Sequence, residues 1–407
     1  MEIDKIVYFN NLNEAKEEKN YTILQNINWS RKQNKDYSSL HSIASYLAMF
    51  CPALPNFFIE KYSNNDDIVM DNFSGRGTTA LVAREMNRKF IGNDLNPYAI
   101  VLSKFKISKV SKSQILKAIT ILEKKYENSD FINKKIDFNE PKIKEILYFY
   151  SESTLRQLLF IRETIGNNWK NISKSDNAVL ALALGLMHGP MKKNGETIYF
   201  SLDMPNTISM APNYVKNYAQ KNGLTRPKVN IFSQLKSRLN KKYDEILKSD
   251  FDAKFFIQDS IKENFKIKNE SVTLVVTSPP YLNIVNYKTS NWLKLWLLGY
   301  ERKKLNNDIK LSDNLKFNEY AIFLTDYLNA IHSKLKMNGK VCLIVGDVTN
   351  KKLIEDVWEL IKNNVKYKFI EIYYDNKYLQ SHKITNMLNS KSGRATKIDK
   401  VLVLEKV

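Results

Sequence analysis

The chain has 407 residues, 43% of them hydrophobic, enough for one large domain with an insertion or for two domains, and no apolar run of about 18 residues would cross a membrane. Lys and Arg number 63 against 43 Asp and Glu, a formal net charge of +20; the excess favours a nucleic-acid partner, and compositional drift explains it equally well. With only Cys51 and Cys342, no Cys/His cluster and no basic, apolar leader, we expect a cytoplasmic protein without a disulfide framework or metal site.

The predicted elements begin after a polar, Asn-rich arm over residues 1–35. An apolar run from residue 66 predicts a buried parallel strand, and a turn with two glycines at 73–79 leads into a helix near 80–86. A second strand is predicted at 89–94. This order of strand, turn, helix and strand is typical of a doubly wound α/β sheet.

A long Lys-rich and mostly helical segment then interrupts the sheet at residues 106–249. Strands and helices alternate again afterwards, and the last two strands are expected to be antiparallel. We therefore predict an α/β, Rossmann-like sheet built from 36–105 and 250–407, with 106–249 as a helical insertion. The elements predicted beyond residue 106 are helices at 178–187, 229–247, 319–335 and 353–363 and strands at 255–259, 271–276, 340–345, 368–374 and 400–404.

A candidate cofactor loop lies between the first strand and its helix, with the sequence Asp71-Asn-Phe-Ser-Gly-Arg-Gly-Thr-Thr79. Gly75 and Gly77 let the backbone approach a ligand closely, and the start of the helix offers free N–H groups. The spacing Gly75-x-Gly77-x-x-Ala80 also fits the loose dinucleotide fingerprint. A dehydrogenase is therefore an alternative to consider.

Acidic residues end the next two predicted strands. Asp94 can accept both hydroxyls of a ribose, or it can cap the helix that begins at Asn96-Pro97. Asp259 and Ser260 end a further strand, where a side chain could read an adenine ring. Together with the glycine loop, these positions favour a nucleoside-bearing cofactor.

The segment Val275-Val-Thr-Ser-Pro-Pro-Tyr281 carries the sharpest catalytic signal. Two prolines cannot continue a central strand, so the chain turns out at the carboxyl edge of the sheet, where ligands bind. The Ser278 hydroxyl and the Pro279 carbonyl can then accept hydrogen bonds from an amino group, and Tyr281 can stack on an extruded base. The alternative is an ordinary Pro-Pro turn with a surface tyrosine.

These two blocks resemble the DNA amino-methyltransferase family that acts on cytosine N4 or adenine N6. Phe73-Ser74-Gly75-Arg-Gly77-Thr78-Thr79 is similar to that family's cofactor motif and Thr-Ser278-Pro279-Pro280-Tyr281 to its catalytic motif. The resemblance implies S-adenosylmethionine as cofactor, with Asp94 on its ribose and Asp259 on its adenine. The segment from His41 to Pro55 resembles the family's segment that closes over the methionine end.

The resemblance also implies a double-stranded DNA substrate, and a restriction endonuclease is an open possibility as a partner. Ser278 is more typical of the cytosine-N4 enzymes, so cytosine N4 is preferred to adenine N6. Asn283 and Tyr287 would line the base pocket or the DNA cleft, and Asn213 and Tyr214 of the insertion would contact DNA. The basic segment 226–242 would do the same, or would be a solvated helix face.

Other classes of protein remain as alternatives. A methyltransferase on RNA bases or on a protein glutamine could use a similar Pro-Pro-Tyr turn, and a DNA-binding module could keep the fold without turnover. A carbon-5 cytosine methyltransferase is disfavoured, because it needs a thiolate on a mobile loop. Cys342 lies within a predicted strand and Cys51 precedes the cofactor loop.

Overall fold

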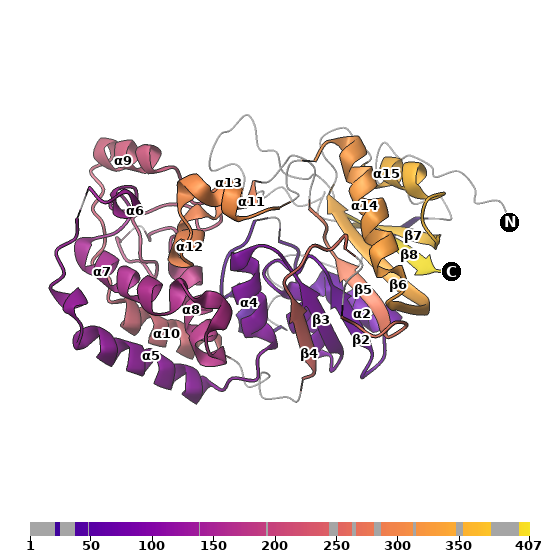
Figure 1. Cartoon of the computed structure of the whole chain (residues 1–407), viewed down its shortest axis with the longest axis horizontal. Helices are drawn as coiled ribbons and strands as arrows, with labels where there is room; N and C mark the ends of the chain where they lie inside the picture. The colour runs from indigo at the N-terminus through magenta and orange to yellow at the C-terminus, as the bar shows by residue number, and fades with distance from the viewer. Residues whose placement is uncertain are drawn as a thin grey trace.

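The computed structural model describes residues 21–24, 37–47, 49–137, 139–192, 194–243, 251–262, 266–280, 286–311, 315–346, 353–375 and 399–407. A sheet flanked by helices forms one side of the molecule and a helical lobe forms the other (Figure 1). None of the helices in these ranges is long and apolar enough to cross a bilayer.

The sheet has eight strands in the order β1-β7-β8-β6-β5-β2-β3-β4. Every pairing is parallel except those of β8, which is antiparallel to both β6 and β7. This confirms the predicted doubly wound sheet and its antiparallel ending. The strands are β1 (Tyr21–Leu24), β2 (Ile68–Asp71), β3 (Lys89–Asn93), β4 (Ala253–Phe256), β5 (Val272–Thr277), β6 (Leu335–Gly346), β7 (Tyr367–Asp375) and β8 (Asp399–Lys406).

Both faces of the sheet are covered, because side chains alternate along each strand and both sets are apolar. Val69 faces α2 (Ala53–Tyr62) and α3 (Thr78–Glu85), whereas Met70 faces α14 (Phe317–His332) and α15 (Leu353–Ile361). The two helix pairs thus close a three-layer sandwich around the strands.

The helical lobe is formed mainly by residues between β3 and β4. Its long central helix α8 is buried along one side against α4 and along the other against α5 and α10. The helices that follow β5 also belong to this lobe, since α12 packs against α4 and α7. The lobe contains α4 (Pro97–Ile107), α5 (Lys112–Glu127), α6 (Pro141–Lys144), α7 (Glu152–Ile161), α8 (Lys174–Leu186), α9 (Pro212–Lys221), α10 (Ile231–Lys242), α11 (Tyr287–Ser290), α12 (Trp292–Leu297) and α13 (Leu305–Asp308).

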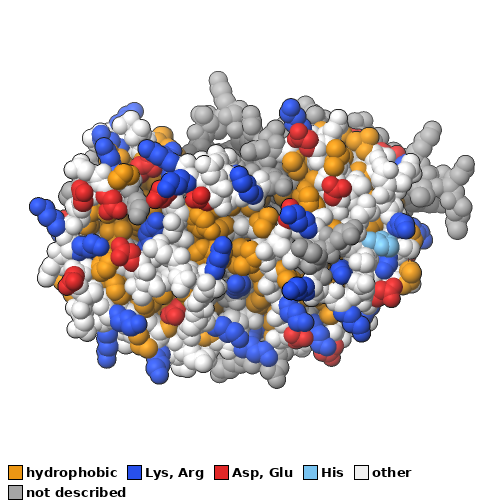
Figure 2. All heavy atoms as spheres, in the orientation of Figure 1, with side chains coloured by type: hydrophobic (Ala, Val, Ile, Leu, Met, Phe, Trp, Pro, Cys, Tyr) orange, Lys and Arg blue, Asp and Glu red, His pale blue; other side chains and the backbone are white. Residues whose placement is uncertain are grey.

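Several predicted boundaries differ from the structure. The helix predicted at 319–335 ends at His332, because Leu335 begins β6. The strand predicted at 255–259 ends at Phe256, because Asp259 lies in a turn where its carboxylate accepts a bond from the Ile261 N–H. Within the predicted N-terminal arm, β1 pairs in parallel with β7 at the edge of the sheet. Lys and Arg are spread over the visible face of both parts, with Asp and Glu interspersed (Figure 2).

Candidate active site

A pocket of about 880 Å³, solvent at its mouth included, opens at the carboxyl ends of β2, β3, β4 and β5. Successive connections leave β2 and β5 in opposite directions along the sheet, so this is the topological switch point of the fold, where α/β sheets bind ligands. The lining residues are Tyr46, Met49, Phe50, Asn72, Phe73, Ser74, Gly75, Arg76, Thr78, Asp94, Leu95, Asn96, Asp259, Ser260, Ser278, Pro280, Tyr287, Leu311 and Phe323.

The loop after β2 depends on a glycine at position 77. Gly77 has φ of 73° in the left-handed region, and a Cβ there would lie 2.8 Å from the Ser103 Oγ. Ser103 in turn donates to the Gly75 carbonyl over 3.0 Å. The crowding at the Cβ position and the positive φ both require glycine at position 77. The loop then leads into α3 at Thr78.

Asp94 is one of the acidic residues on the pocket wall. Its Oδ2 accepts from the Gly75 N–H and its Oδ1 from the Asn96 N–H, each over 2.8 Å. Burial raises the pKa of Asp94 to about 6, against the lowering effect of these two bonds. A carboxylate has about four lone-pair sites, so both oxygens keep the capacity to accept from a ligand's hydroxyls.

An amide network joins the ends of the neighbouring strands beside Asp94. The Asn93 side chain donates to the Asn72 carbonyl over 3.2 Å and to the Ser260 Oγ over 3.0 Å. Ser260 also donates to the Asn72 carbonyl, and Tyr327 donates to the Asn72 Oδ1 over 2.9 Å. The Asn72 Nδ2 has no hydrogen-bond acceptor among the described residues, although it is buried in the pocket wall. A ligand with an acceptor atom would satisfy it.

The pocket that Asp259 lines also has an apolar wall. The Phe73 ring packs against Phe323 and Tyr327 of α14, at centroid distances of 5.7 and 5.0 Å. Phe73 and Phe323 both reach the pocket, together with Leu95. Flat apolar surface beside a hydrogen-bonding edge fits a planar heterocycle, so the pocket suits a nucleoside: ring, ribose hydroxyls and a polar tail.

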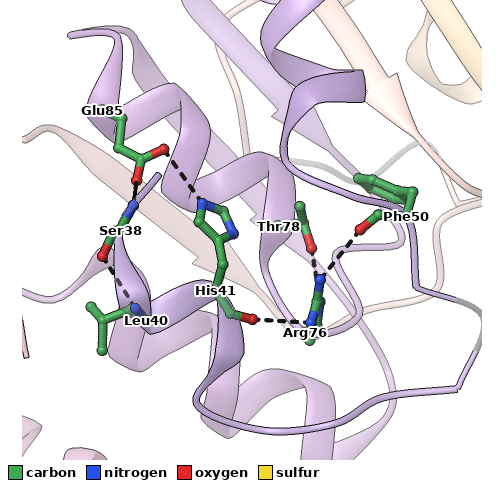
Figure 3. Close-up of polar contacts among 7 residues, drawn as sticks. All are labelled: Ser38, Leu40, His41, Phe50, Arg76, Thr78 and Glu85. Atoms are coloured by element: carbon green, nitrogen blue, oxygen red, sulfur yellow. Dashed lines mark hydrogen bonds and ion pairs between the residues drawn. The ribbon is translucent and has the colours of Figure 1, made fainter. Parts of the chain in front are cut away.

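Arg76 of the glycine loop holds residues 37–47 and 49–50, called the cover below, of which Tyr46, Met49 and Phe50 line the pocket. Its guanidinium donates to the carbonyls of His41 and Phe50 over 3.0 and 3.3 Å and to the Thr78 Oγ1 over 3.1 Å (Figure 3). The same segment is fixed from α3 by Glu85, which accepts from the Ser38 N–H and contacts the His41 ring. The cover is thus hydrogen-bonded both to the glycine loop, through Arg76, and to α3, through Glu85.

Tyr46 of this segment forms part of the pocket wall. Its ring is stacked on Tyr98 and tilted against Tyr287, with centroid distances of 5.4 and 5.8 Å. Its hydroxyl accepts from the Asn96 Nδ2 over 2.8 Å. Tyr46 and Tyr287 therefore bring the cover and the start of α11 together at one side of the pocket.

Ser278 lies at the carboxyl end of β5, on the wall of the same pocket. Its hydroxyl donates to the Ile344 carbonyl of β6 over 3.1 Å. Because the proton is directed at β6, the oxygen presents acceptor lone pairs, as the predicted contact with an amino group requires. Pro280 also lines the pocket.

The predicted site residues fall into four groups. Asp71, Gly77 and Thr79 support the loop without lining the pocket. Pro55, buried in α2, and Pro279, buried directly after Ser278, do not line it either, and Met49 and Phe50, which precede α2, reach the pocket instead. Asn213 and Tyr214 lie on α9 of the helical lobe. Tyr281 and Asn283 lie outside the described residues. The lining positions predicted from the sequence are Phe73, Ser74, Gly75, Thr78, Asp94, Asp259, Ser260, Ser278, Pro280 and Tyr287.

Several lining residues were not predicted. Tyr46, Met49, Arg76 and Phe323 reach the pocket through tertiary packing. Arg76 stands within the predicted loop, so a charged side chain between two glycines was the available signal. Phe323 had none, because it is one apolar residue among many in an amphipathic helix.

Comparison with known proteins supports the predicted family. A family model described as DNA methylase, of the N6 and N4 methyltransferase type, matches residues 4–105 and 272–405, together more than half of the chain. The matched parts contain the glycine loop, Asp94 and Ser278. The unmatched part between them covers the predicted insertion and β4.

Curated relatives share the same kind of name. The chain is 22% identical to the Type II methyltransferase M.MjaII of Methanocaldococcus jannaschii over 396 residues, 79% of this chain and 74% of that protein. It is 23% identical to the Type II methyltransferase M.MvaI of Kocuria varians, over 82% of this chain and 70% of that protein. A short match of 67 residues, 16% of this chain and 20% of that protein, is 39% identical to the Type II methyltransferase M.PvuII of Proteus hauseri.

Proposed function

Since the chain belongs to the DNA methylase family, we propose that it methylates the exocyclic amino group of one base in a specific double-stranded DNA sequence. S-adenosylmethionine is the methyl donor. The base we propose is cytosine, at N4, with adenine at N6 as the alternative. The observation that carries this proposal is that the Ser278 hydroxyl and the Asp94 carboxylate open onto one pocket.

The pocket residues fit the donor. Asp94 would accept the ribose hydroxyls, and Asp259 and Ser260 would meet the adenine edge beside Phe73. The buried Asn72 Nδ2, which lacks an acceptor among the described residues, would donate to the same molecule. When bound, the donor supplies a methyl group on a positively charged sulfur.

Ser278 would prepare the amino group for attack. Its oxygen and the Pro279 carbonyl would each accept a hydrogen bond from one N–H of the amine. These two bonds would move the nitrogen toward tetrahedral geometry and direct its lone pair at the methyl group. The lone pair then forms the new N–C bond as the S–C bond breaks, and the surplus proton leaves to solvent. Most of the rate enhancement would come from orientation. The target base must leave the duplex stack to reach this pocket, and Tyr281 would stack on it.

Serine at the catalytic position supports cytosine N4 by resemblance to the enzymes of that specificity. A neutral hydroxyl accepts equally well from the amino group of adenine, so the choice depends on the shape of the base pocket. We further propose that the methylation protects host DNA, alone or beside a restriction endonuclease that reads the same sequence.

The test is transfer of tritiated methyl groups from S-adenosylmethionine to unmethylated bacterial DNA, followed by mass spectrometry of the digested nucleosides. N4-methylcytosine is expected, and N6-methyladenine would select the alternative. The Ser278→Ala variant serves as the matched control for contaminating activity. Label in RNA or protein, with none in DNA, would contradict the proposal.

A further inference from the structure

Helix α9 of the helical lobe presents an unusual exposed face. Tyr214 and Tyr218, one turn apart, remain 50% and 41% exposed, and their rings stack at 5.9 Å with an interplanar angle of 9°. Only Pro212 and Val215 of this helix are buried. The remaining exposed side chains can donate hydrogen bonds or carry positive charge: Asn213, Lys216, Asn217, Gln220 and Lys221.

The surrounding sequence has one sign of charge. Residues 204–243 contain eight Lys or Arg and no Asp or Glu. Lys216, Lys221, Arg226 and Lys228 of this stretch are exposed, and basic side chains stand along the upper left edge of the molecule, where α9 lies (Figures 1 and 2). Such a surface attracts a polyanion and repels other basic surfaces.

The residues leading into α9 are bonded to the pocket side of the molecule. The Ser209 N–H donates to the Ser290 carbonyl of α11 over 2.7 Å, and the Trp292 Nε1 donates to the Met210 carbonyl over 3.0 Å. Tyr287, at the start of α11, lines the pocket. Pro212 is three residues beyond Ser209, a reach of roughly 10 Å at most. The first turn of α9 is therefore held at a fixed position near the element that borders the active site.

We propose that the exposed face of α9 binds double-stranded DNA next to the target base. Lys216 and Lys221 contact phosphates, and the tyrosines and amides of the same face enter the groove. A ten-residue helix is about 15 Å long, and the major groove, roughly 12 Å wide, admits such a helix. Asn and Gln side chains are suited to base edges, and Lys side chains to the phosphates of the backbone. This inference rests on the proposed function, because it concerns the DNA substrate of the same site.

The experiment compares DNA binding by the full chain and by a Tyr214→Ala/Tyr218→Ala variant. Binding of a fluorescein-labelled DNA duplex is measured by anisotropy, and binding of S-adenosylhomocysteine by calorimetry. Because alanine preserves the helix, we expect the cofactor affinity to be unchanged. Removal of the two aromatic rings should lower the DNA affinity about tenfold or more. Leu360→Ala, an exposed apolar residue on α15, is the control for a surface truncation elsewhere.

Salt dependence tests the phosphate contacts separately. A Lys216→Ala/Lys221→Ala variant should reduce the slope of log affinity against log salt concentration by about 2. The control is Lys124→Ala/Lys125→Ala, which removes the same charge from the exposed side of α5. Equal slopes for the two double variants would overturn the inference.

Lysine acetylation footprinting of the unaltered protein gives a result that does not depend on any variant. DNA should protect Lys216 and Lys221 and leave Lys124 and Lys125 reactive; the reverse pattern would overturn the inference. If the protein methylates DNA and α9 is neither protected nor required, the inference fails alone. If the protein binds S-adenosylhomocysteine and neither binds nor methylates DNA, the proposed function fails with it.

Discussion

The Thr277 hydroxyl of β5 donates a hydrogen bond to the Asp71 Oδ1 of β2 over 2.6 Å. The Phe73 N–H donates to the same Thr277 oxygen over 3.2 Å. Ser278 follows Thr277 directly, and Phe73 begins the glycine loop. One hydroxyl group therefore fixes the position of β5 relative to the glycine loop.

This contact predicts a pH-dependent cost for Thr277→Val. Burial raises the pKa of Asp71 to about 7, and the Thr277 bond acts in the opposite direction by favouring the ionised form. A raised folded-state pKa gives stability that is present at low pH and lost as pH rises toward that pKa. Without the bond, the ionised Asp71 is less stabilised in the folded protein. The free energy of unfolding of the variant, measured in urea, should therefore fall by about 1–2 kcal/mol more at pH 8.5 than at pH 5. An equal loss at both values, or the same difference in an Asp71→Asn background, would contradict this account.

Cofactor affinity should depend on the ionisation of Asp94. Burial raises its pKa to about 6, and only the carboxylate can accept hydrogen bonds from both ribose hydroxyls with full strength. The affinity for S-adenosylhomocysteine should therefore fall about tenfold as pH drops from 8 to 5. Calorimetric titrations at several pH values check this. Asp94→Asn should bind weakly with no such dependence, and a flat profile in the unaltered protein would remove Asp94 from the ribose contact.

Ser278→Ala should separate catalysis from cofactor binding. Loss of a pre-positioned hydrogen-bonding group typically lowers the rate of the chemical step about 10²-fold. We expect that reduction in single-turnover methyl transfer, with unchanged affinity for S-adenosylhomocysteine. Ser113→Ala, on the exposed start of α5, is the matched control. An unaltered single-turnover rate would exclude the proposed amine contact.

Arg76→Lys should loosen the pocket cover without altering chemistry. A lysine ammonium cannot span both the His41 and Phe50 carbonyls in the planar geometry that guanidinium provides. Loss of about one net hydrogen bond should raise the dissociation constant for S-adenosylhomocysteine about tenfold, mainly through faster dissociation in stopped-flow measurements, while kcat at saturation is retained. Arg302→Lys, at an ion pair with Glu145, is the control. A change in kcat alone would contradict a covering role.

Gly77→Ala should cost more stability than alanine at other left-handed glycines. Gly195 and Gly223 also have positive φ, but a Cβ there meets nothing within 4 Å. Substitution at these two positions should cost about 1–2 kcal/mol from backbone conformation alone. Gly77→Ala adds the clash with Ser103 and should cost clearly more in urea unfolding. Equal costs at all three positions would mean that the crowding at Gly77 is relieved without strain.

Much of the site could be predicted because parallel strands bring their carboxyl ends to one edge of the sheet. Residues that follow different strands, such as Asp94, Asp259 and Ser278, therefore meet without any contact between them being visible in the sequence. The glycine loop could be predicted as well, because the left-handed φ at position 77 is a local requirement for glycine.

The rest depends on long-range packing that has no local signal. Tyr46 is held at the pocket by the rings of Tyr98, stacked on it, and Tyr287, tilted against it, and these three rings come from distant parts of the chain. Strand β1 could not be predicted within the polar arm, because a four-residue strand at the edge of a sheet needs little apolar pattern. The division into catalytic domain and insertion stays a prediction.

The helices that follow β5 limit how this protein could be re-engineered. Trp292, Leu293, Leu295 and Leu297 of α12 are buried in the core of the lobe that residues 106–243 mostly supply. Exchanging that insertion alone with a relative's would leave these side chains facing a foreign surface. A chimera that exchanges the helical lobe must therefore carry residues 287–309 together with the insertion, so that the lobe is inherited as two segments of the chain rather than one.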